Sequence, residues 1–407
     1  MKSSNHIIVP DKCTGCALCA NACPKDAIAM LWNEEGFLVP DVDVTLCIEC
    51  GLCVRLCPAE KEWQDHIMPE MESIAAYGAW NTNTYIHRSS SSGGIFTALA
   101  SLVFEEGGCV FGVSWKDKEN AAFSKAESFD ELVPMRGSKY VQAIPANVYR
   151  EVRTELKKDR KVLFVGTPCQ VYALKAFLKK EYDKLLTVDI VCHGVPSRNL
   201  LRAYIAEIEA NSGKELDQIF FREKRGDWLN YCVKRVFKDG TCDLVPHAED
   251  DFMHLFLCDH MLNKACYNCP HAHLPRPGDI TLGDFWGVQM LHADWPISEG
   301  IASMMVGSKR GNEAVKNLIK AELVECHVES FSNLLRGQFR SYIKHKDDMA
   351  SPKRFRALLM LNNFKLRNIY IILCNSFEVG PIHIRKDSCL IKICVFFYRI
   401  VKIILKI

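Results

Sequence analysis

A duplicated run of four cysteines constrains the fold of this chain more than any other feature. The pattern C-x2-C-x2-C-x3-C-P occurs at residues 13–24 and again at residues 47–58 of a 407-residue sequence. The chain begins MKSSNHIIVPDKC, without the apolar core of a signal peptide. We therefore expect a reducing cytoplasm, in which thiolates bind metal rather than form disulfides. Between the runs, IAMLWNEEGFLVP is typical of strand, turn, strand, and so small a segment would need its metal to stay folded.

The spacing of the two runs is that of bacterial two-cluster ferredoxins. Three cysteines of each run wrap one [4Fe-4S] cluster, and the fourth, which precedes proline, reaches the other cluster. We therefore predict two clusters with crossed ligands. The first set is Cys13, Cys16, Cys19 and Cys57, and the second is Cys47, Cys50, Cys53 and Cys23. The alternative is structural zinc on paired C-x2-C knuckles, which two complete runs ending in Cys-Pro disfavour.

The chain beyond the cysteine runs predicts a larger α/β body. Strand-turn-helix units at KVLFVGTPCQVYALKAFLKK and LLTVDIVCHGVPSRNLLRAYIAEIEANSG indicate a parallel sheet flanked by helices, and antiparallel strands follow from about residue 214. The predicted fold class is α+β or α/β: a small ferredoxin-like domain, a mixed α/β flavoprotein-type body and a C-terminal helical tail. The predicted domains are residues 1–66, 74–155, 156–345 and 346–407.

Four later cysteines lie where a further cluster can be expected. Cys169 and Cys192 each follow the C-terminal end of a predicted parallel strand, the edge at which open α/β sheets bind ligands. Cys266 and Cys269 form a C-x2-C pair in a proline-flanked loop, with Cys258 in reserve. The four can hold a third [4Fe-4S] cluster. The spacing alone fits buried structural cysteines, a zinc site or a redox-active pair as well.

Chemistry on an organic substrate would need a two-electron cofactor, because clusters pass single electrons and a flavin converts between the two. No G-x-G-x-x-G follows any predicted strand, so a Rossmann-type site is not expected. Residues 89–94 offer another phosphate cradle, since they are small and open a predicted helix whose amide groups can bind a pyrophosphate. A serine-rich linker that ends in a helix cap explains the same residues.

Four further side chains are candidates for chemistry at such a site. His193, Lys139, Asp284 and Trp286 lie in loops after predicted strands or in the basic run RGSKYVQA. We predict His193 and Lys139 as catalytic proton donors and Asp284 as a cofactor-binding residue, while Trp286 can stack on a flavin or a substrate. Each of them, taken singly, is also explained as a surface or packing residue.

Positive charge is concentrated in the C-terminal tail. Residues 346–407 carry twelve Lys/Arg against four Asp/Glu, so the rest of the chain is negative, which argues against nucleic-acid binding. On a helix, residues 385–407 place basic side chains on one arc and apolar ones elsewhere, as in interfacial helices on anionic membranes. The alternative is a helix that docks on the body or on a partner subunit. We expect a cytoplasmic protein, and in the membrane case one that is peripheral at the inner face.

Several unlinked motifs, in one order, resemble the beta subunit of coenzyme F420 hydrogenase/dehydrogenase. The motifs are SSSGG, RGSKYVQ, GTPCQ, CHGVPS, CYNC and ITLGDFWG, and the likeness covers about residues 74–320. This resemblance implies an iron-sulfur flavoprotein with FAD on the α/β body and hydride exchange between the flavin and a deazaflavin or another organic acceptor. The residues that it implies for the third cluster are Cys169, Cys192, Cys266 and Cys269. Those that it implies for the flavin site are Ser91, Gly93, Gly94 and Lys139.

The resulting hypothesis is an oxygen-sensitive oxidoreductase with a ferredoxin or another redox protein as its partner. Electrons would enter the N-terminal clusters, pass to the third cluster and be collected in pairs by FAD for a small organic substrate, or follow the reverse direction. A non-catalytic relay subunit and a membrane-surface adaptor without a cofactor are the alternatives. The fused cluster module and the basic tail depart from the family's hydrogenase partners, which leaves dependence on a hydrogenase open.

Overall fold

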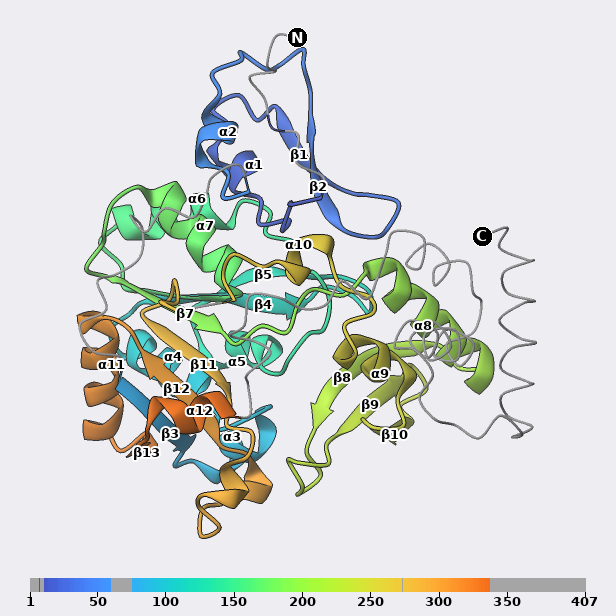
Figure 1. The fold of residues 1–407 in the computed structure, drawn as a ribbon, viewed down its shortest axis with the longest axis vertical. Helices are drawn as coiled ribbons and strands as arrows, with labels where there is room; N and C mark the ends of the chain where they lie inside the picture. The colour runs from blue at the N-terminus through green and yellow to red at the C-terminus, as the bar shows by residue number, and fades with distance from the viewer. Residues whose placement is uncertain (1–6, 8–10, 60–74, 273, 337–407) are drawn as a thin grey trace, which may run out of the picture.

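The computed structural model describes residue 7 and residues 11–59, 75–272 and 274–336 (Figure 1). The boundaries predicted at residues 66, 74 and 345 lie outside these described residues, as does the predicted tail helix of residues 385–407. Within the described ranges, no helix has both the length and the apolar character that crossing a membrane requires.

The N-terminal module, defined here as residues 11–59, is built around its cysteine runs. α1 (Leu18–Ala22) and α2 (Leu52–Leu56) are short helices inside the two runs, and each follows a residue in the left-handed conformation. Between the runs, β1 (Ile28–Trp32) pairs with β2 (Leu38–Val42) in antiparallel register. This arrangement confirms the strand, turn, strand that the sequence predicts.

The body is organised around an eight-stranded sheet in the order β13-β3-β12-β11-β7-β6-β4-β5. The strands are β3 (Ala75–Asn81), β4 (Cys109–Trp115), β5 (Ala121–Ala126), β6 (Val162–Gly166), β7 (Leu185–Ile190), β11 (Ile280–Asp284), β12 (Ala302–Val306) and β13 (Val324–Val328). β4, β6, β7 and β11 run parallel, as predicted, but the other neighbouring pairs are antiparallel. The sheet is therefore mixed rather than parallel throughout. One reason is that no α-helix crosses the sheet between β11 and β12. Neighbouring strands that are joined without such a crossover commonly pair in the antiparallel direction.

Helices cover both faces of this sheet. α4 (Ile95–Glu105) and α11 (Lys309–Lys320) pack on one face, and their apolar side chains share a core with β4, β6, β7, β11 and β12. α6 (Val148–Lys157) and α7 (Pro168–Leu178) pack on the other face. α3 (Thr84–Ser89), α5 (Phe129–Leu132) and α12 (Phe331–Arg336) are short connecting helices.

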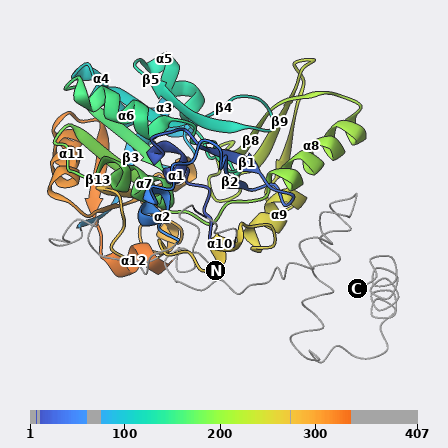
Figure 2. The same cartoon turned by 90° about the horizontal axis from the view of Figure 1, so that it is seen from above.

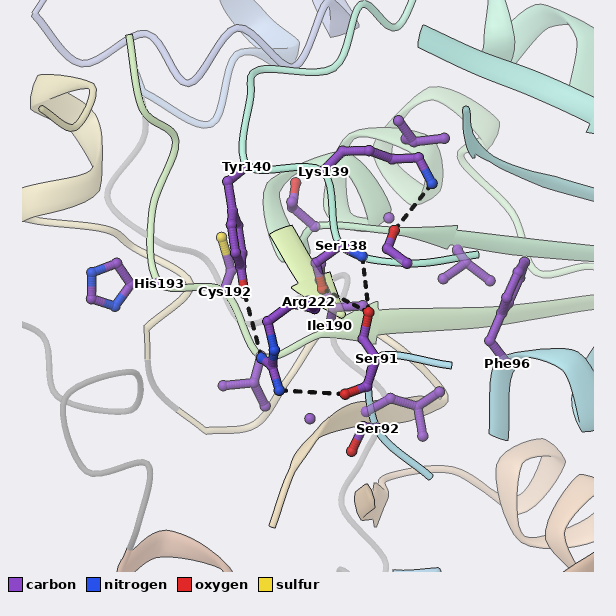
Figure 3. Close-up of a pocket in the computed structure, with 18 of the residues that line it drawn as sticks. Ser91, Ser92, Phe96, Ser138, Lys139, Tyr140, Ile190, Cys192, His193 and Arg222 are labelled. Carbon is purple, nitrogen blue, oxygen red and sulfur yellow. Dashed lines mark hydrogen bonds between the residues drawn. The ribbon is translucent and has the colours of Figure 1, made fainter. Parts of the chain in front are cut away.

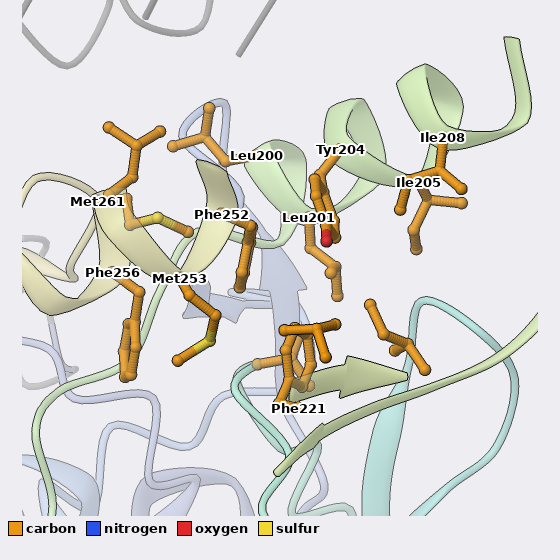
Figure 4. Packing of buried hydrophobic residues seen from close by; sticks show 14 of the residues in the cluster. Leu200, Leu201, Tyr204, Ile205, Ile208, Phe221, Phe252, Met253, Phe256 and Met261 are labelled. Carbon is orange, nitrogen blue, oxygen red and sulfur yellow. The ribbon is translucent and has the colours of Figure 1, made fainter. Parts of the chain in front are cut away.

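A second sheet forms a lobe beside the main one (Figures 1 and 2). β8 (Leu216–Glu223), β9 (Cys232–Phe237) and β10 (Cys242–Pro246) are antiparallel, as predicted, and residues 238–241 form the turn between β9 and β10. α8 (Arg198–Ser212) and α9 (Asp251–Leu257) bury their apolar faces against this sheet (Figure 4). α10 (Lys264–Tyr267) follows in the cysteine-rich loop.

The N-terminal module packs directly on the body through α1. This helix contacts α6 and α7, which lie between the module and the sheet in Figure 1. Leu18 of α1 is 1% exposed and belongs to the same apolar core as Val152 of α6 and Val171 of α7. Leu18 therefore joins the module to the core of the body, while Cys19, Ile28 and other buried residues of the module form a cluster of their own.

Side chains of α6 hold the backbone of the first cysteine run. The Tyr149 hydroxyl donates a hydrogen bond to the Cys16 carbonyl oxygen over 2.7 Å. The Arg150 guanidinium donates to the carbonyl oxygens of Asn21 and Cys23 over 2.7 and 2.8 Å. Because these bonds lie on both sides of α1, they fix its orientation as well as its position.

Gln142 forms a second link between the module and the body. Its side chain is buried, its Oε1 accepts a hydrogen bond from the Leu38 N–H over 2.8 Å, and its Nε2 donates to the Thr14 carbonyl oxygen over 3.2 Å. Gly15 leaves room for this amide, because a Cβ at Gly15 would lie 2.1 Å from the Gln142 Nε2. The Gln142 amide therefore ties the first cysteine loop to β2 and to the body at once.

Replacing Gln142 with alanine should lower the free energy of unfolding of the cluster-loaded protein by about 2 kcal/mol, since the buried Leu38 N–H loses its acceptor. Anaerobic guanidinium denaturation, followed by cluster absorbance, measures this change. Asn199→Ala is the matched control, because it removes only an exposed hydrogen bond to Glu34, and it should cost less than about 0.5 kcal/mol. Equal losses in the two variants would contradict the docking role of Gln142.

Candidate functional site

A cavity of about 780 Å³ lies at the C-terminal ends of the central parallel strands (Figure 3). Residues 166–167, 190–192 and 283–284 line it from the ends of β6, β7 and β11. The loop before α4, at residues 90–94, and the segment of residues 136–143 line it as well. This is the edge of the sheet at which the sequence predicts ligand binding.

The cysteines predicted to hold the first cluster lie close together. Burial, with charge on the neighbouring Cys16 and Cys57 thiols, raises the pKa of Cys13 to about 12. Burial, then Cys16, Cys13 and Cys57, raises the pKa of Cys19 well above its usual range. The structure thus brings Cys57 of the second run to the first three cysteines of the first run, as the crossed arrangement requires. Buried thiolates so close together need a positive counter-charge, which fits iron.

The other four cysteines of the module line one small cavity. They are Cys23, Cys47, Cys50 and Cys53. Cys50 is exposed and Cys53 is buried, so this cavity reaches the protein surface on one side. The donor chemistry of four thiols around one space fits a second cluster, at the end of the module that carries α2 (Figure 1).

Three of the four cysteines predicted for a third cluster lie near one another, and two of them line the cavity. Burial raises the pKa of the Cys169 thiol well above its usual range, the Thr167 hydroxyl at 3.1 Å opposes this shift, and charge on Cys16, Cys192 and Cys269 adds to it. Cys169 and Cys192 both line the large cavity. The Cys169 thiol is therefore close both to Cys192 and Cys269 and to the first cysteine run of the module.

Backbone contacts bring the loops of Cys192 and Cys269 together. Pro196 forms a β-bridge with Leu262, and the N–H groups of Ser197 and Asn263 donate to carbonyl oxygens of the opposite loop over 2.9 and 2.8 Å. Cys266 lies on α10, three residues before Cys269. Within the described residues, no three His, Cys, Asp or Glu side chains are arranged to hold a single metal ion.

The predicted phosphate cradle lies at the cavity and opens α4. Gly94 is the N-cap of this helix and has a φ of 78°, a conformation that favours glycine. A Cβ at Gly93 would lie 2.3 Å from the Ala79 carbonyl oxygen and 2.8 Å from the Ala302 nitrogen. Gly93 is thus explained by close packing of the loop against β3 and β12. This packing sets the helix N-terminus at the cavity wall.

Polar contacts fix the serine residues of this loop. The Ser91 hydroxyl accepts a hydrogen bond from the Ser138 N–H over 3.1 Å, and the Ser91 carbonyl oxygen accepts one from Arg222 over 3.3 Å. Lys224 donates to the Ser92 carbonyl oxygen over 2.8 Å. Burial lowers the pKa of Lys224 to about 7. The cradle is therefore held in place by Arg222 of β8 and by Lys224, the residue that follows this strand.

Asp284 lines the cavity, and its carboxylate binds Arg222. The two side chains pair over 2.8 Å, and the Trp228 indole N–H donates to Asp284 over 3.3 Å. The Arg222 guanidinium lies 4.2 Å from the centre of the Tyr231 ring and 5.2 Å from that of Trp286. Burial opposes the charge of Arg222, but Asp284 raises its pKa above the usual range. Asp284 therefore helps to position the cradle indirectly, because it holds the Arg222 side chain that donates a hydrogen bond to the Ser91 carbonyl oxygen.

Lys139 and Arg136 bring further positive charge to the cavity. Lys139 donates to the carbonyl oxygens of Arg136 and Gly137 over 2.7 and 3.0 Å, and burial lowers the pKa of Lys139 to about 7. The buried Nε of Arg136 has no hydrogen-bond partner among the described residues. Beside a helix N-terminus, these donors suit an anionic ligand, so the residues present fit the diphosphate of FAD.

His193 lines the cavity next to Cys192 (Figure 3). Its Nε2 lies 2.9 Å from a carboxylate oxygen of Asp259 and 3.0 Å from the Phe256 carbonyl oxygen. A carboxylate at one ring nitrogen fixes the orientation of an imidazole. The sequence did not reveal Asp259, because this residue acts only through a contact made in the folded chain.

Sequence reasoning also missed Arg222, Lys224 and Arg136. Arg222 and Lys224 belong to FFREKRGD, whose charges are typical of an exposed strand end. Arg136 stands in the RGSKYVQ motif, three residues before the predicted Lys139, so the motif itself was the available signal.

Comparison with known families identifies both parts of the chain. Residues 159–330 match the family that forms the C terminus of the coenzyme F420 hydrogenase/dehydrogenase beta subunit, and residues 12–61 match the 4Fe-4S dicluster domain. The chain joins a 4Fe-4S dicluster domain to the C-terminal domain of the coenzyme F420 hydrogenase/dehydrogenase beta-subunit family. It is therefore an iron-sulfur protein of an oxidoreductase-subunit family, and the dicluster domain supports the two predicted [4Fe-4S] clusters of the module.

Individual relatives cover different parts of the chain. An uncharacterised protein of Methanocaldococcus jannaschii is 24% identical over 205 residues, which are 43% of this chain and 55% of that protein. A ferredoxin of Alicyclobacillus acidocaldarius is 36% identical over 70 residues, which are 16% of this chain and 80% of the ferredoxin. A chain of the F420-reducing [NiFe] hydrogenase complex from Methanosarcina barkeri has 18% identity and a TM-score of 0.48, over 70% of this chain and 92% of that one.

The affinity of the cavity for a diphosphate should depend on pH through Lys139. The pKa of Lys139 is lowered to about 7, so its positive charge is present below that pH and is lost above it. Between pH 6 and pH 8.5 the dissociation constant of ADP, used as the diphosphate probe, should rise about tenfold. Calorimetric titration measures this dependence. Lys139→Arg keeps its charge throughout and should flatten the profile, and a slope unchanged in that variant would exclude Lys139 as the cause.

Proposed function

We propose that this chain is an iron-sulfur flavoprotein oxidoreductase. Electrons pass from the two module clusters through a third cluster on Cys169, Cys192, Cys266 and Cys269 to FAD in the large cavity, and then to an organic substrate. One observation carries this proposal: the Cys169 thiol lines the cavity and also lies near both Cys192 and Cys16 of the first cysteine run.

The proposed electron path follows the shared core of module and body. Cys16 belongs to the run that α6 and α7 hold, and Cys169 lies on the first turn of α7. Thr167 caps this helix with both contacts of a capping box, so the backbone that carries Cys169 is well fixed. A fixed distance between the two cysteines suits direct electron transfer without movement of the module.

In the proposed flavin site, each group has a distinct task. FAD, when bound, supplies the exchange between single electrons and electron pairs. The amide groups at the start of α4, with Ser91, Arg136 and Lys139, would bind its diphosphate. Tyr140 and Trp286 line the cavity with aromatic surface for its ring system. His193, oriented by Asp259, can hold or release a proton at its ring nitrogen.

The substrate is proposed as a small organic molecule that accepts or donates a hydride equivalent. The family to which residues 159–330 belong makes a deazaflavin the first compound to test. A redox protein would exchange single electrons with the module. Electron relay to a partner enzyme is the second candidate, because the dicluster domain can serve either role.

The decisive experiment is the identification and quantification of the cofactor released by acid from the anaerobically purified full-length chain. We expect about one FAD and about 12 iron atoms per chain, since three [4Fe-4S] clusters hold that number. Mass spectrometry and a colorimetric iron assay provide the two counts. Intact clusters without flavin would overturn the flavoenzyme proposal in favour of the relay.

Cys192→Ala should remove the third cluster and separate the module from the flavin. Its iron content should fall to about eight atoms per chain, with flavin retained but reduced by ferredoxin at least about tenfold more slowly. Iron analysis and anaerobic stopped-flow absorbance test these outcomes. Cys258→Ala is the matched control and should behave as the unchanged chain. Unaltered flavin reduction in Cys192→Ala would refute the proposed path.

A further inference from the structure

Three large apolar side chains are exposed together on the N-terminal module. Val44, Leu46 and Ile48 are 67%, 52% and 57% exposed and fall within five consecutive residues. We refer to these three residues as the apolar patch. Single exposed apolar side chains are normal on a protein surface, but a group of them commonly marks an interaction site.

The apolar patch lies on the loop that carries two predicted ligands of the second cluster. Cys47 stands between Leu46 and Ile48, and Ile48 lines the same small cavity as the four cysteines of that cluster. Cys50 is exposed, whereas the cysteines near the body are half-buried or buried. A protein that covers the patch would therefore come close to the second cluster and stay remote from the first.

The charges around the apolar patch favour a basic partner. Asp41, Asp43 and Glu49 are all exposed and flank the patch in sequence. Two basic residues lie nearby: Lys25 at the cavity, and Arg55, which folds back to donate a hydrogen bond to a carbonyl oxygen of the cysteine loop. Acidic side chains outnumber basic ones here, so a partner with positive charges around an apolar centre is complementary.

We propose that the apolar patch is the docking surface for an external one-electron redox protein with an apolar centre and a basic rim. The inference rests on the electron path proposed above, and it adds the site at which electrons enter or leave. In the outward direction, the reduced second cluster loses one electron and the partner's redox centre gains it. No bond is formed or broken in this step, and no proton is transferred.

Binding of a model partner to the full-length, cluster-loaded protein tests the proposal without turnover. The probe is oxidised cytochrome c, whose haem edge is surrounded by lysine side chains. Calorimetry should give a dissociation constant that rises with ionic strength, because opposite charges attract. Leu46→Ser and Glu49→Lys should each weaken binding about tenfold at low salt. Leu46 does not line the cluster cavity, so an unchanged iron content verifies that the Leu46→Ser variant is intact.

Matched controls on the body separate a local effect from a general one. Val328 is 81% exposed on β13, and Glu313 is exposed on α11, both on the part of the body away from the module (Figure 1). Val328→Ser and Glu313→Lys repeat the two changes there and should leave binding unchanged. Equal weakening by control and patch variants, or no weakening by either patch variant, would overturn the proposal.

Electron transfer gives the second measurement. In stopped-flow mixing, the reduced protein should reduce cytochrome c about tenfold more slowly in the patch variants, while its own reduction by dithionite stays unchanged.

A version that ends before Arg385 tests whether the basic tail of this chain occupies the patch instead. Binding of cytochrome c only after that truncation would identify the tail as the occupant and reject an external partner. These outcomes do not depend on FAD, so a failed flavoenzyme proposal would leave the binding result interpretable.

Discussion

The burial of Leu18 in the core of the body is the constraint on which the other features of the structure depend. Leu18 lies between Cys16 and Cys19, so its packing against α6 and α7 holds the first cysteine run at the body surface. Tyr149 and Arg150 then fix the backbone on either side of α1. Leu56 of the second run packs against the same core, but it is only partly buried. The first run therefore forms the inner end of the module, and the exposed Cys50 lies at its outer end.

The sequence predicted the local elements well, because their signals are local. Continuous apolar runs identified β6 and β7, and Ser197 at the start of α8 accepts a capping hydrogen bond from the Leu200 N–H. The docking of the module was not predictable in the same way. Nothing in the sequence distinguishes Gln142 and Tyr149 from other polar residues. Their role appears only in the folded chain, where each donates a hydrogen bond to a carbonyl oxygen of the module.

The residues of the candidate site also differ in whether the sequence alone could identify them. The sequence located the thiols that follow predicted parallel strands, because the carboxyl ends of such strands meet at one edge of the sheet. The motif that contains Gly93 also pointed to a loop that lines the cavity, but the structure gives this glycine a packing reason, namely its approach to the backbone of β3 and β12. Arg222 could not be found from sequence, because its role depends on Asp284, which is 62 residues away along the chain.

The cations around the cavity differ in how their charge is balanced, and this difference bears on what the cavity can bind. Arg222 is neutralised by Asp284 and lies close to the rings of Tyr231 and Trp286, so it contributes order rather than net charge. Lys139 contacts carbonyl oxygens. Burial lowers the pKa of Lys139, so keeping this side chain charged there has a free-energy cost. An anionic group beside Lys139 and Arg136 would remove that cost. Aromatic surface from Tyr140 and Trp286 lines the same cavity. A ligand that joins an anion to a flat ring system satisfies both requirements, which is why we favour a dinucleotide flavin over a small inorganic anion.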